Sequence, residues 1–335
     1  TTTTHMIRAI LLAAGKKVGM IGTTGTVIGD VVTPTLNTTP ESYELHQAFA
    51  QMVEAGCEYA VMEVSSQGIK MHRTDGLYFN YAIFTNISPD HIGPGEHADF
   101  EEYLYYKTRL LNMCGIGLVN KDDKHAPQII KAANCELCTY SEESKEADFV
   151  ASDIRYVSQP DFVGTEFHIS GKYDMEVRLG IPGLFNVVNA LAAVSVCSFL
   201  GLDQARISHA LENIRVNGRM EIVYTSERCT VLVDYAHNAV SMESLLSTLR
   251  DYKPKRLVCV FGCGGNRSKD RRYSMGEIGG KMADLSIITA DNSRYEKVED
   301  IIADIRGSIE KTGGKFIEIP DRREAIRYSI LHAQP

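Results

Sequence analysis

The sequence predicts an α/β protein with two domains. Short apolar runs, typical of buried parallel strands, alternate with amphipathic segments, typical of helices, along most of the chain. Polar clusters follow several of these strands, at the edge where open α/β sheets bind their ligands. With 335 residues, the chain is long enough for two such domains. We expect the first domain to span residues 1–216 and the second to span residues 217–335.

The elements of the first domain follow from periodicity and from glycine and proline boundaries. Amphipathic helices are expected at 7–15 and 41–55, each closed by glycine. Apolar strands in βαβ order are expected at 18–22, 59–62, 81–85 and 117–120. The glycine-rich run at 22–26 has no lysine and does not open a helix, so we do not interpret it as a phosphate loop. Alternation over 147–179 predicts an antiparallel side sheet, and helices follow at 183–199 and 204–214.

The second domain is expected to contain a Rossmann-like three-layer arrangement. Strands are expected at 230–234, 256–261, 285–289 and 315–319, with helices between them. Polar clusters follow three of these strands, at 234–238, 262–267 and 291–294. Three clusters at the carboxyl edge of one sheet favour a binding site.

Composition and charge exclude several classes of function. The formal net charge of −8 and the pI of about 5.7 give no basic surface for nucleic acid or anionic lipid. No apolar run approaches the length of a membrane span, and nothing resembles a signal peptide. We therefore expect a cytoplasmic monomer with no nucleic-acid partner and no membrane insertion. Among the 8 cysteines, only Cys135 and Cys138 have the spacing of a metal or redox pair, and two free thiols are favoured over zinc.

The residues after two of the expected strands suit a metal and phosphate site. Glu63 follows the strand at 59–62, and a polar loop with His91 follows the strand at 81–85. Carboxyl ends of parallel strands meet at one crevice, where a carboxylate suits a hard cation such as Mg²⁺. Lys107 follows on a helix, so the arrangement predicts an enzyme that uses ATP. The alternative is that Glu63 caps a helix and His91 is a surface histidine.

Several longer motifs lie in order along the chain: NTTPES, MEVSSQGIKMHR, NISPDHIGPGEH, YLYYKTRL, NGRME, VDYAHN, FGCGGNRSKDRR and DNSR. Through them the chain resembles the Mur ligases, and most closely their MurE type, across nearly its whole length. The resemblance implies a central P-loop-type ATPase domain, with a mostly parallel sheet and a small antiparallel side sheet, followed by a Rossmann-like amino-acid-binding domain. It implies that ATP phosphorylates the carboxylate of UDP-MurNAc-L-Ala-D-Glu, and that the amine of a diamino acid attacks the acyl phosphate in peptidoglycan synthesis.

The resemblance also assigns roles to individual residues. Glu63, His91 and Thr1 would be magnesium ligands, and Lys107 would be carbamylated to help hold a second metal ion. The residues that would contact the UDP-muramoyl-dipeptide are Asn37, Thr38, Thr39, Ser65 and Arg73. Those that would face ATP are Thr1, Asn189, Arg219, Asp234 and His237. Those that would bind the incoming amino acid are Arg267, Asp291, Asn292, Ser293 and Arg294.

Two positions depart from the pattern of the family, and one indicates specificity. Relatives that add meso-diaminopimelate carry an Asp-Asn-Pro-Arg box, whose arginine binds the second carboxylate, whereas lysine-adding relatives lack that arginine. Arg294 therefore favours diaminopimelate over L-lysine. Ser293 replaces the proline of the box and loosens the loop. Met71 stands where many relatives carry glutamine, which removes one polar contact.

The resemblance further predicts that both ends are truncated. The phosphate loop of the family reads Gly-Thr-x-Gly-Lys-Thr, and Thr1 matches its last threonine. The preceding strand, a uridine-binding domain and a C-terminal Gly-Lys-Gly-His-Glu segment would be missing, so we expect poor ATP binding and negligible ligase activity. Three alternatives stay open: a catalytically dead binding fragment, another Mur-type or folylpolyglutamate-type ligase, and a hydrolase with Thr1 as its N-terminal nucleophile.

Overall fold

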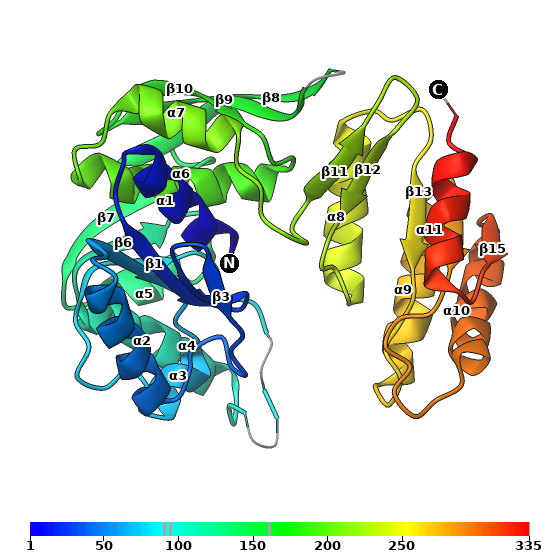
Figure 1. The fold of residues 1–335 in the computed structure, drawn as a ribbon, viewed down its shortest axis with the longest axis horizontal. Coiled ribbons are helices and arrows are strands. Elements are labelled where there is room, and N and C mark those ends of the chain that lie inside the picture. Colours follow the sequence, from blue (N-terminus) through cyan, green and yellow to red (C-terminus); the bar gives the residue numbers. More distant parts are fainter. Residues whose placement is uncertain (90–91, 94–95, 160–161, 335) are drawn as a thin grey trace. The chain divides into compact units, whose positions relative to one another are not determined.

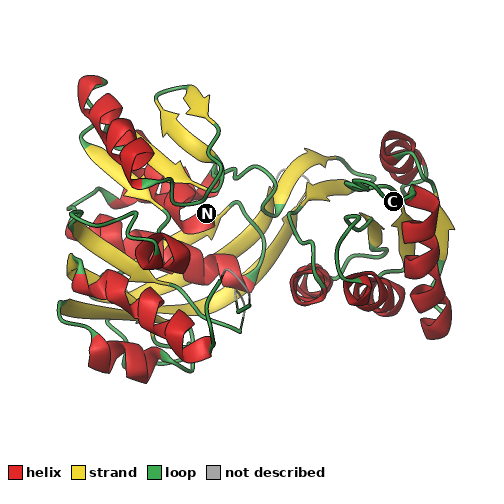
Figure 2. Cartoon of the chain, turned by 90° about the horizontal axis from the view of Figure 1, so that it is seen from below, coloured by secondary structure: helices red, strands yellow, loops and turns green. Residues whose placement is uncertain are grey.

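The computed structural model describes residues 1–89, 92–93, 96–159 and 162–334. The chain divides into two compact units (Figure 1). The first unit comprises Thr1–Arg155, Thr165–Gly180 and Leu184–Ile214, and the second comprises Tyr156–Gly164, Ile181–Gly183 and Arg215–Pro335. Helices and strands alternate along both units (Figure 2), which confirms the predicted α/β class.

The elements that lie mainly in the first unit are α1 (Thr2–Ala13), β1 (Val18–Gly22), β2 (Gly25–Ile28), β3 (Val31–Thr33), α2 (Ser42–Glu54), β4 (Tyr59–Met62), α3 (Ser66–Lys70), β5 (Phe79–Phe84), α4 (Phe100–Arg109), the short 3₁₀ helix η1 (Leu110–Asn112), β6 (Cys114–Asn120), α5 (Ala126–Ala132), β7 (Glu136–Ser141), β8 (Phe149–Gln159), β9 (Phe162–Gly171), β10 (Met175–Leu179), α6 (Leu184–Phe199) and α7 (Gln204–Glu212).

These strands form two sheets in the described part of the chain. One has the order β3-β2-β1-β4 and the other β10-β9-β8-β7-β6-β5. β1 is parallel to β4, and β5, β6, β7 and β8 are parallel neighbours. β9 and β10 are antiparallel and extend the second sheet, so the predicted side sheet is continuous with parallel strands. The hairpin of β2 and β3 was not predicted, because strands of four and three residues carry too little periodicity.

Helix α1 begins earlier than its apolar face indicates. Periodicity predicts a start at Ile7, whereas the helix begins at Thr2, and Thr1 precedes it as the N-cap residue. Met6 and Ile10 of this helix are completely buried. Helix α6 is apolar on all sides, and its residues 190–194 are completely buried.

The elements of the second unit are β11 (Glu221–Thr225), β12 (Thr230–Val233), α8 (Ala239–Asp251), β13 (Val258–Phe261), α9 (Lys269–Met282), β14 (Leu285–Ile288), α10 (Val298–Thr312), β15 (Phe316–Glu318) and α11 (Arg322–Leu331). β13, β14 and β15 form a parallel sheet, as predicted. The strand predicted at 230–234 differs: as β12 it pairs in antiparallel fashion with β11. A tight turn joins the two, with the Ser226 amide donating to the carbonyl of Cys229 at 3.0 Å, so the nearest partner is local.

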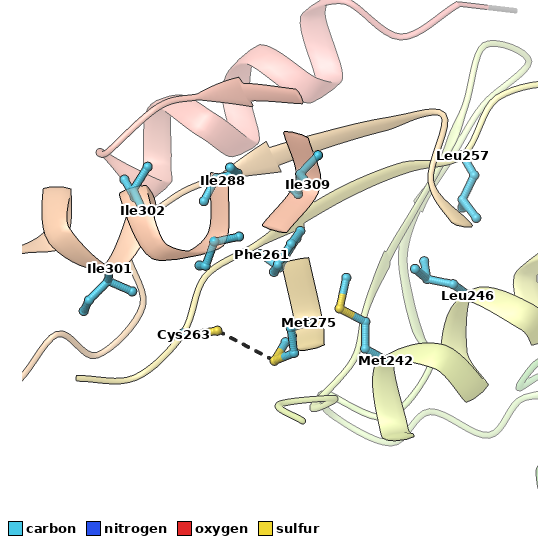
Figure 3. Close-up of a cluster of buried hydrophobic side chains, with 11 residues drawn as sticks. Met242, Leu246, Leu257, Phe261, Cys263, Met275, Ile288, Ile301, Ile302 and Ile309 are labelled. Carbon is cyan, nitrogen blue, oxygen red and sulfur yellow. Dashed lines mark hydrogen bonds between the residues drawn. The ribbon is translucent and has the colours of Figure 1, made fainter. Parts of the chain in front are cut away.

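Helices cover both faces of the sheet in the second unit. Ile288 belongs to a buried cluster with Met242 of α8, Met275 of α9 and Ile309 of α10 (Figure 3). The neighbouring Ile287 points to the opposite face, where it clusters with α11. The predicted three-layer arrangement is therefore confirmed. Within the described ranges, no helix is both long enough and apolar enough to span a membrane.

Candidate active site

Glu63 lies directly after β4, at the strand end that its sequence position predicts. Its amide donates to the carbonyl of Ile21 at 2.9 Å, which continues the ladder with β1. Its side chain is 15% exposed. Oε2 accepts hydrogen bonds from Thr1 Oγ1 at 2.9 Å and Thr23 Oγ1 at 3.0 Å, and Oε1 accepts from the Thr23 amide at 3.1 Å. The start of α1 and the β1–β2 turn thus hold one carboxylate.

Hydrogen bonds from two threonines hold the Glu63 carboxylate. Burial acts to raise the pKa of Glu63, whereas the hydrogen bonds from Thr23 and Thr1 act to lower it. Ionised carboxylate and hydroxyl oxygens are the ligands that Mg²⁺ prefers. Glu63 and Thr1 therefore fit a magnesium site.

The β1–β2 turn contributes a residue that the sequence analysis missed. A Cβ at Gly22 would lie 2.3 Å from Glu63 Oε1, so only glycine lets the strand pass this close to the carboxylate. Thr23 follows in the turn and binds Glu63 through both its amide and its hydroxyl. Within the run at 22–26, Thr23 and Thr24 form the turn between β1 and β2, and Gly25 and Thr26 begin β2, which was not predicted. The Gly-Thr pair at 22–23 was the feature of the sequence that could have indicated this contact with Glu63.

Glu63 and Lys107 line one cavity of about 640 Å³ in the first unit. Thr1, Thr85 and Asn86 also line it. Lys107 lies in the last turn of α4, and its Nζ is 5.3 Å from the centre of the Tyr103 ring. The ring face attracts a cation at this range. Two of the predicted metal-site side chains thus reach the same space.

The predicted ligand His91 lies outside the described residues, so its role stays a prediction. Among residues 1–89, 92–93, 96–159 and 162–334, no group of three or more His, Cys, Asp or Glu side chains is placed to hold a metal ion. Cys135 and Cys138 are free thiols. Among the described residues, the candidate ligands for a cation are therefore the carboxylate oxygens of Glu63 and the hydroxyl oxygens of Thr1 and Thr23.

The hydroxyls predicted to contact the muramoyl substrate have different surroundings. Thr39 is completely buried; its Oγ1 donates to the carbonyl of Glu63 at 3.1 Å and accepts from the Ser65 amide at 2.9 Å. Ser65 caps α3 by accepting a hydrogen bond from the Gly68 amide at 2.9 Å. Thr38 keeps part of its surface exposed, with its Oγ1 3.1 Å from that of Thr23. Thr39 and Ser65 fix the loop, and Thr38 is the more accessible hydroxyl.

Arg73 and Asn37 both contact the carboxylate of Glu41. Arg73 is 13% exposed at its side chain, and its Nη2 lies 2.6 Å from Glu41 Oε1. Its Nη1 donates to the carbonyl of Thr39 at 3.2 Å. Asn37 Nδ2 donates to the same Glu41 oxygen at 3.5 Å. The Glu41 carboxylate therefore occupies the position beside Arg73 that an anionic ligand would take, so such a ligand would have to compete with Glu41 for Arg73. Met71 is 58% exposed.

The residues predicted to face the nucleotide fall in both units. In the first unit, Asn189 on α6 accepts a hydrogen bond from Thr3 Oγ1 at 3.0 Å, which links it to α1. In the second unit, Asp234 Oδ2 accepts from the Met220 amide at 2.8 Å. The Arg219 guanidinium lies 4.6 Å from the centre of the Tyr235 ring. Exposed His237 stacks edge-on to the same ring, at 5.2 Å between centroids.

The two loops predicted to bind the amino acid are joined in the second unit. The Gly265 amide donates to the carbonyl of Asn292 at 2.8 Å, and the Tyr295 amide donates to Asn266 Oδ1 at 3.2 Å. A Cβ at Gly265 would lie 1.9 Å from the Ser293 carbonyl oxygen, so glycine permits this contact. Arg267, Asp291, Asn292 and Arg294 are all exposed in these loops. The structure thus brings the predicted amino-acid residues to one place.

Behind these loops lies Arg272, a residue that the sequence analysis did not single out. It is 1% exposed and binds Glu296 and Asp304, with Nη1 2.9 Å from Asp304 Oδ2. The Glu296 carboxylate also accepts a hydrogen bond from the Asn266 amide. Arg272 contacts the loops through Glu296. The motif FGCGGNRSKDRR contains several arginines, and nothing in it indicates which of them is buried in this way.

Comparison with known proteins identifies the family. The Mur ligase middle domain matches residues 1–197, and the Mur ligase glutamate ligase domain matches residues 218–335. The chain belongs to the Mur ligase family. The predicted family is therefore confirmed, and with it an ATP-dependent ligase family whose members use ATP and Mg²⁺.

Several relatives of this Mur ligase chain share one name. It is 40% identical over 340 residues to the UDP-N-acetylmuramoyl-L-alanyl-D-glutamate--2,6-diaminopimelate ligase of Caldanaerobacter subterraneus subsp. tengcongensis, covering 100% of this chain and 68% of that protein. The enzyme of that name from Geobacillus thermodenitrificans is 37% identical over 345 residues, covering 100% of this chain and 69% of that protein. A solved structure of a ligase of the same name has a TM-score of 0.75 at 31% identity, covering 100% of this chain and 68% of that one.

Proposed function

We propose that this chain carries the sites of an ATP-dependent ligase that joins meso-2,6-diaminopimelate to UDP-N-acetylmuramoyl-L-alanyl-D-glutamate. The observation that carries the proposal is identity of 40% along 340 residues with an enzyme named for this reaction. Glu63 and Lys107 on one cavity, and two joined loops with Arg294, are the local features that support it. The MurE-type reaction forms an amide between a substrate carboxylate and an amine of the diamino acid.

Glu63 and Thr1 are the proposed magnesium ligands, with His91 joining from residues outside the described ranges. Bound ATP would supply the phosphoryl group that turns a carboxylate into an acyl phosphate, and Mg²⁺ would neutralise the charge of the phosphate oxygens. The Glu63 carboxylate would bind the cation, and the buried Thr39 holds the carbonyl of Glu63 in place. As a metal ligand, Glu63 would orient the ATP phosphates and the substrate carboxylate and would not transfer a proton.

Lys107 is proposed to carry a carbamate. Its neutral amine would add to CO₂ and release a proton, which replaces a cation with an anion on the wall that also contains Glu63. The Tyr103 ring, whose centre is 5.3 Å from Nζ, would lie beside the carbamate. The change of charge would add a second anionic oxygen donor for a metal ion.

The muramoyl substrate is proposed to contact Thr38, Ser65, Arg73 and Asn37, with Thr39 supporting the loop. Arg73 could bind an anionic group of the substrate if Glu41 moves away from it, since the two now form an ion pair. For the nucleotide, the proposed contacts are Asn189 in the first unit and Arg219, Asp234 and His237 in the second. The Tyr235 ring with Arg219 forms a stacked pair of planar groups of the type that can receive a base.

The diamino acid is proposed to bind at the joined loops, with Arg294 on its second carboxylate. Arg267, Asp291, Asn292 and Ser293 would contact its remaining polar groups. A guanidinium pairs bidentately with a carboxylate, whereas L-lysine presents an ammonium at that end. Diaminopimelate should therefore be preferred over lysine.

Calorimetry tests the amino-acid site without requiring turnover. We expect meso-diaminopimelate to bind the whole chain at least about tenfold more tightly than L-lysine, because a charged hydrogen-bonded pair contributes about 1.5–3 kcal/mol. Arg294→Gln should bring the affinity for diaminopimelate down to that for lysine. The control is Arg323→Gln, an exposed arginine on α11, which should leave both affinities unchanged.

Magnesium-dependent binding of ADP tests the ligase against a dead binding fragment. Glu63→Gln should weaken that binding about tenfold, because the loss of one ionised ligand costs roughly 1.4 kcal/mol or more. Glu54→Gln, an exposed substitution on α2, should not change it. ADP binding that ignores both magnesium and Glu63 would count against the proposed metal site. Equal affinity for the two amino acids would remove the assignment of diaminopimelate.

A further inference from the structure

The loop after β14 holds Arg294 in an unusual backbone conformation. Arg294 has a φ of 50°, in the left-handed region that residues other than glycine seldom adopt. The Cβ of such a residue lies close to its carbonyl oxygen, so the conformation persists only where neighbouring contacts maintain it. The sequence of this loop, residues 289–297, contains neither glycine nor proline. The conformation of Arg294 therefore depends on the contacts around it.

Two local hydrogen bonds surround Arg294 within its own loop. The Arg294 amide donates to Asn292 Oδ1 at 3.3 Å, and the Glu296 amide donates to the carbonyl of Ser293 at 2.9 Å. Both bonds join residues of the same loop, so they would be kept if the whole loop moved. They shape the turn but do not fix it to the neighbouring loop.

Two further hydrogen bonds attach this loop to the loop after β13. The Gly265 amide donates to the carbonyl of Asn292 at 2.8 Å, and Asn266 Oδ1 accepts from the Tyr295 amide at 3.2 Å. These two bonds lie on either side of Arg294 in the sequence. The first uses only backbone atoms, whereas the second depends on the side chain of Asn266.

The conformation and contacts of Asn266 suit it to hold the neighbouring loop. Its φ is 52°, and asparagine tolerates the left-handed region better than most residues with a side chain. Its amide donates to the carboxylate of Glu296, which accepts two hydrogen bonds from the buried Arg272. Asn266 is thus held through its own backbone and holds Tyr295 with its side chain. An apolar side chain would supply no acceptor here.

We propose that Asn266 is a positioning residue that holds Arg294 in its left-handed conformation, and that this conformation gives the site its preference for an amino acid with a second carboxylate. The inference rests on the proposed function, in which Arg294 pairs with that carboxylate. Backbone conformation decides the direction in which a side chain leaves a loop. Without the acceptor of Asn266, Arg294 would return to a negative φ, and its guanidinium would no longer meet the second carboxylate.

The two candidate amino acids should respond differently to a displaced Arg294. Diaminopimelate presents a carboxylate that a guanidinium can bind, whereas L-lysine presents only an ammonium at that end. Displacement of Arg294 should therefore weaken the binding of diaminopimelate and leave the binding of lysine nearly unchanged. General damage to the loops would weaken both. The ratio of the two affinities thus separates a positioning role from a purely structural one.

Asn266→Gly tests this role, because glycine keeps the left-handed backbone available at residue 266 and removes only the side-chain acceptor. Calorimetry on the whole chain should show that the affinity for meso-diaminopimelate falls about tenfold, whereas that for L-lysine changes less than about twofold. Hydrogen exchange followed by NMR should become about tenfold faster at the Tyr295 amide, which loses its acceptor. Asn266→Asp keeps an oxygen acceptor at this position and should retain the preference for diaminopimelate.

Lys253→Gly is the matched control for the change of backbone. Lys253 is exposed and has a φ of 52°, so its replacement by glycine also removes a side chain from a left-handed position. It lies between α8 and β13, before the strand, whereas Asn266 lies after the strand. Lys253→Gly should leave both affinities and the exchange of the Tyr295 amide as they are in the parent chain.

Three outcomes would contradict the inference. If the parent chain prefers diaminopimelate and Asn266→Gly keeps that preference, Asn266 does not position Arg294, although the proposed function stands. An equal loss of affinity for both amino acids would mean that Asn266 only supports the fold of the loops. Equal affinities in the parent chain would remove the assignment of diaminopimelate itself, and the inference with it. The parent chain therefore tests the proposed function, and the variant tests the role of Asn266.

Discussion

Arg272 donates to both carboxylate oxygens of Glu296, at 2.7 and 2.8 Å, from a side chain that is 1% exposed. Glu296 in turn accepts a hydrogen bond from the Asn266 amide in the loop after β13. Burial acts to lower the pKa of Arg272, but the hydrogen bonds that Arg272 donates to Glu296 and Asp304 outweigh it and raise the pKa. A buried cation thereby fixes the loop that contains Arg267.

Arg272→Met should destabilise the protein by about 2–4 kcal/mol, because two carboxylates lose a buried partner. The chain has no tryptophan, so urea unfolding followed by tyrosine fluorescence measures the change. Arg306→Met is the matched control: Arg306 pairs with Glu318 on the surface, 42% exposed, and should cost less than about 1 kcal/mol. Similar losses for both variants would mean that the burial of Arg272 contributes little.

Gly265→Ala should disrupt the contact between the two amino-acid loops. The added Cβ would lie 1.9 Å from the carbonyl oxygen of Ser293, so the loops must separate at a cost of about 2 kcal/mol. Gly264→Ala is a close control, because the nearest atom to its Cβ is 3.6 Å away. We expect calorimetry to show weaker diaminopimelate binding for the first variant only. Unchanged binding by Gly265→Ala would show that the loops adapt.

The sequence predicts the elements whose signal is local. β1 and β4 have the predicted bounds because each is a short apolar run next to glycine or charged residues. β12 was assigned to the wrong sheet because its partner β11 has a weak pattern and its pairing depends on a tight turn. A strand's own apolar pattern shows that it is a strand but not which neighbour it chooses.

The same distinction holds for the site. The position of Glu63 was predictable because it directly follows the apolar run that forms β4. Thr23 and Arg272 were not, because the contacts that matter join residues 40 and 24 positions apart and appear only after folding. The motifs indicated the loops, and packing decided which side chains are buried behind them.

Thr39→Val tests the buried hydroxyl that links Glu63 to α3. Valine has the same shape but leaves the Ser65 amide and the Glu63 carbonyl without this partner, which should cost about 1–3 kcal/mol. Thr38→Val, one residue earlier and partly exposed, should change the free energy of unfolding by less than about 0.5 kcal/mol. Urea unfolding measures both. If the two variants lose equal stability, the hydroxyl of Thr39 does not serve as this link.

Glu142 should oppose folding at neutral pH. Burial, together with the neighbouring carboxylates of Asp122 and Glu143, raises the pKa of Glu142 to about 7. Its Oε2 is buried, and among the described residues it has no hydrogen-bond partner. The ionised form is therefore disfavoured in the folded protein relative to the unfolded chain, whose glutamates have the ordinary pKa of 4.5.

The pH dependence follows from these two pKa values. Between pH 4.5 and about 7 the folded protein binds a proton at Glu142 that the unfolded chain has lost, so the free energy of unfolding falls as the pH rises through this range. Glu142→Gln removes the penalty and should stabilise the protein by about 1–2 kcal/mol at pH 8, after allowance for partial exposure, with no gain at pH 4.5. Glu54→Gln, at an exposed position on α2, is the control and should show little gain at either pH. Because other carboxylates titrate alike in both proteins, the difference between variant and parent isolates Glu142, and a gain of equal size at both pH values would show that its charge is not the cause.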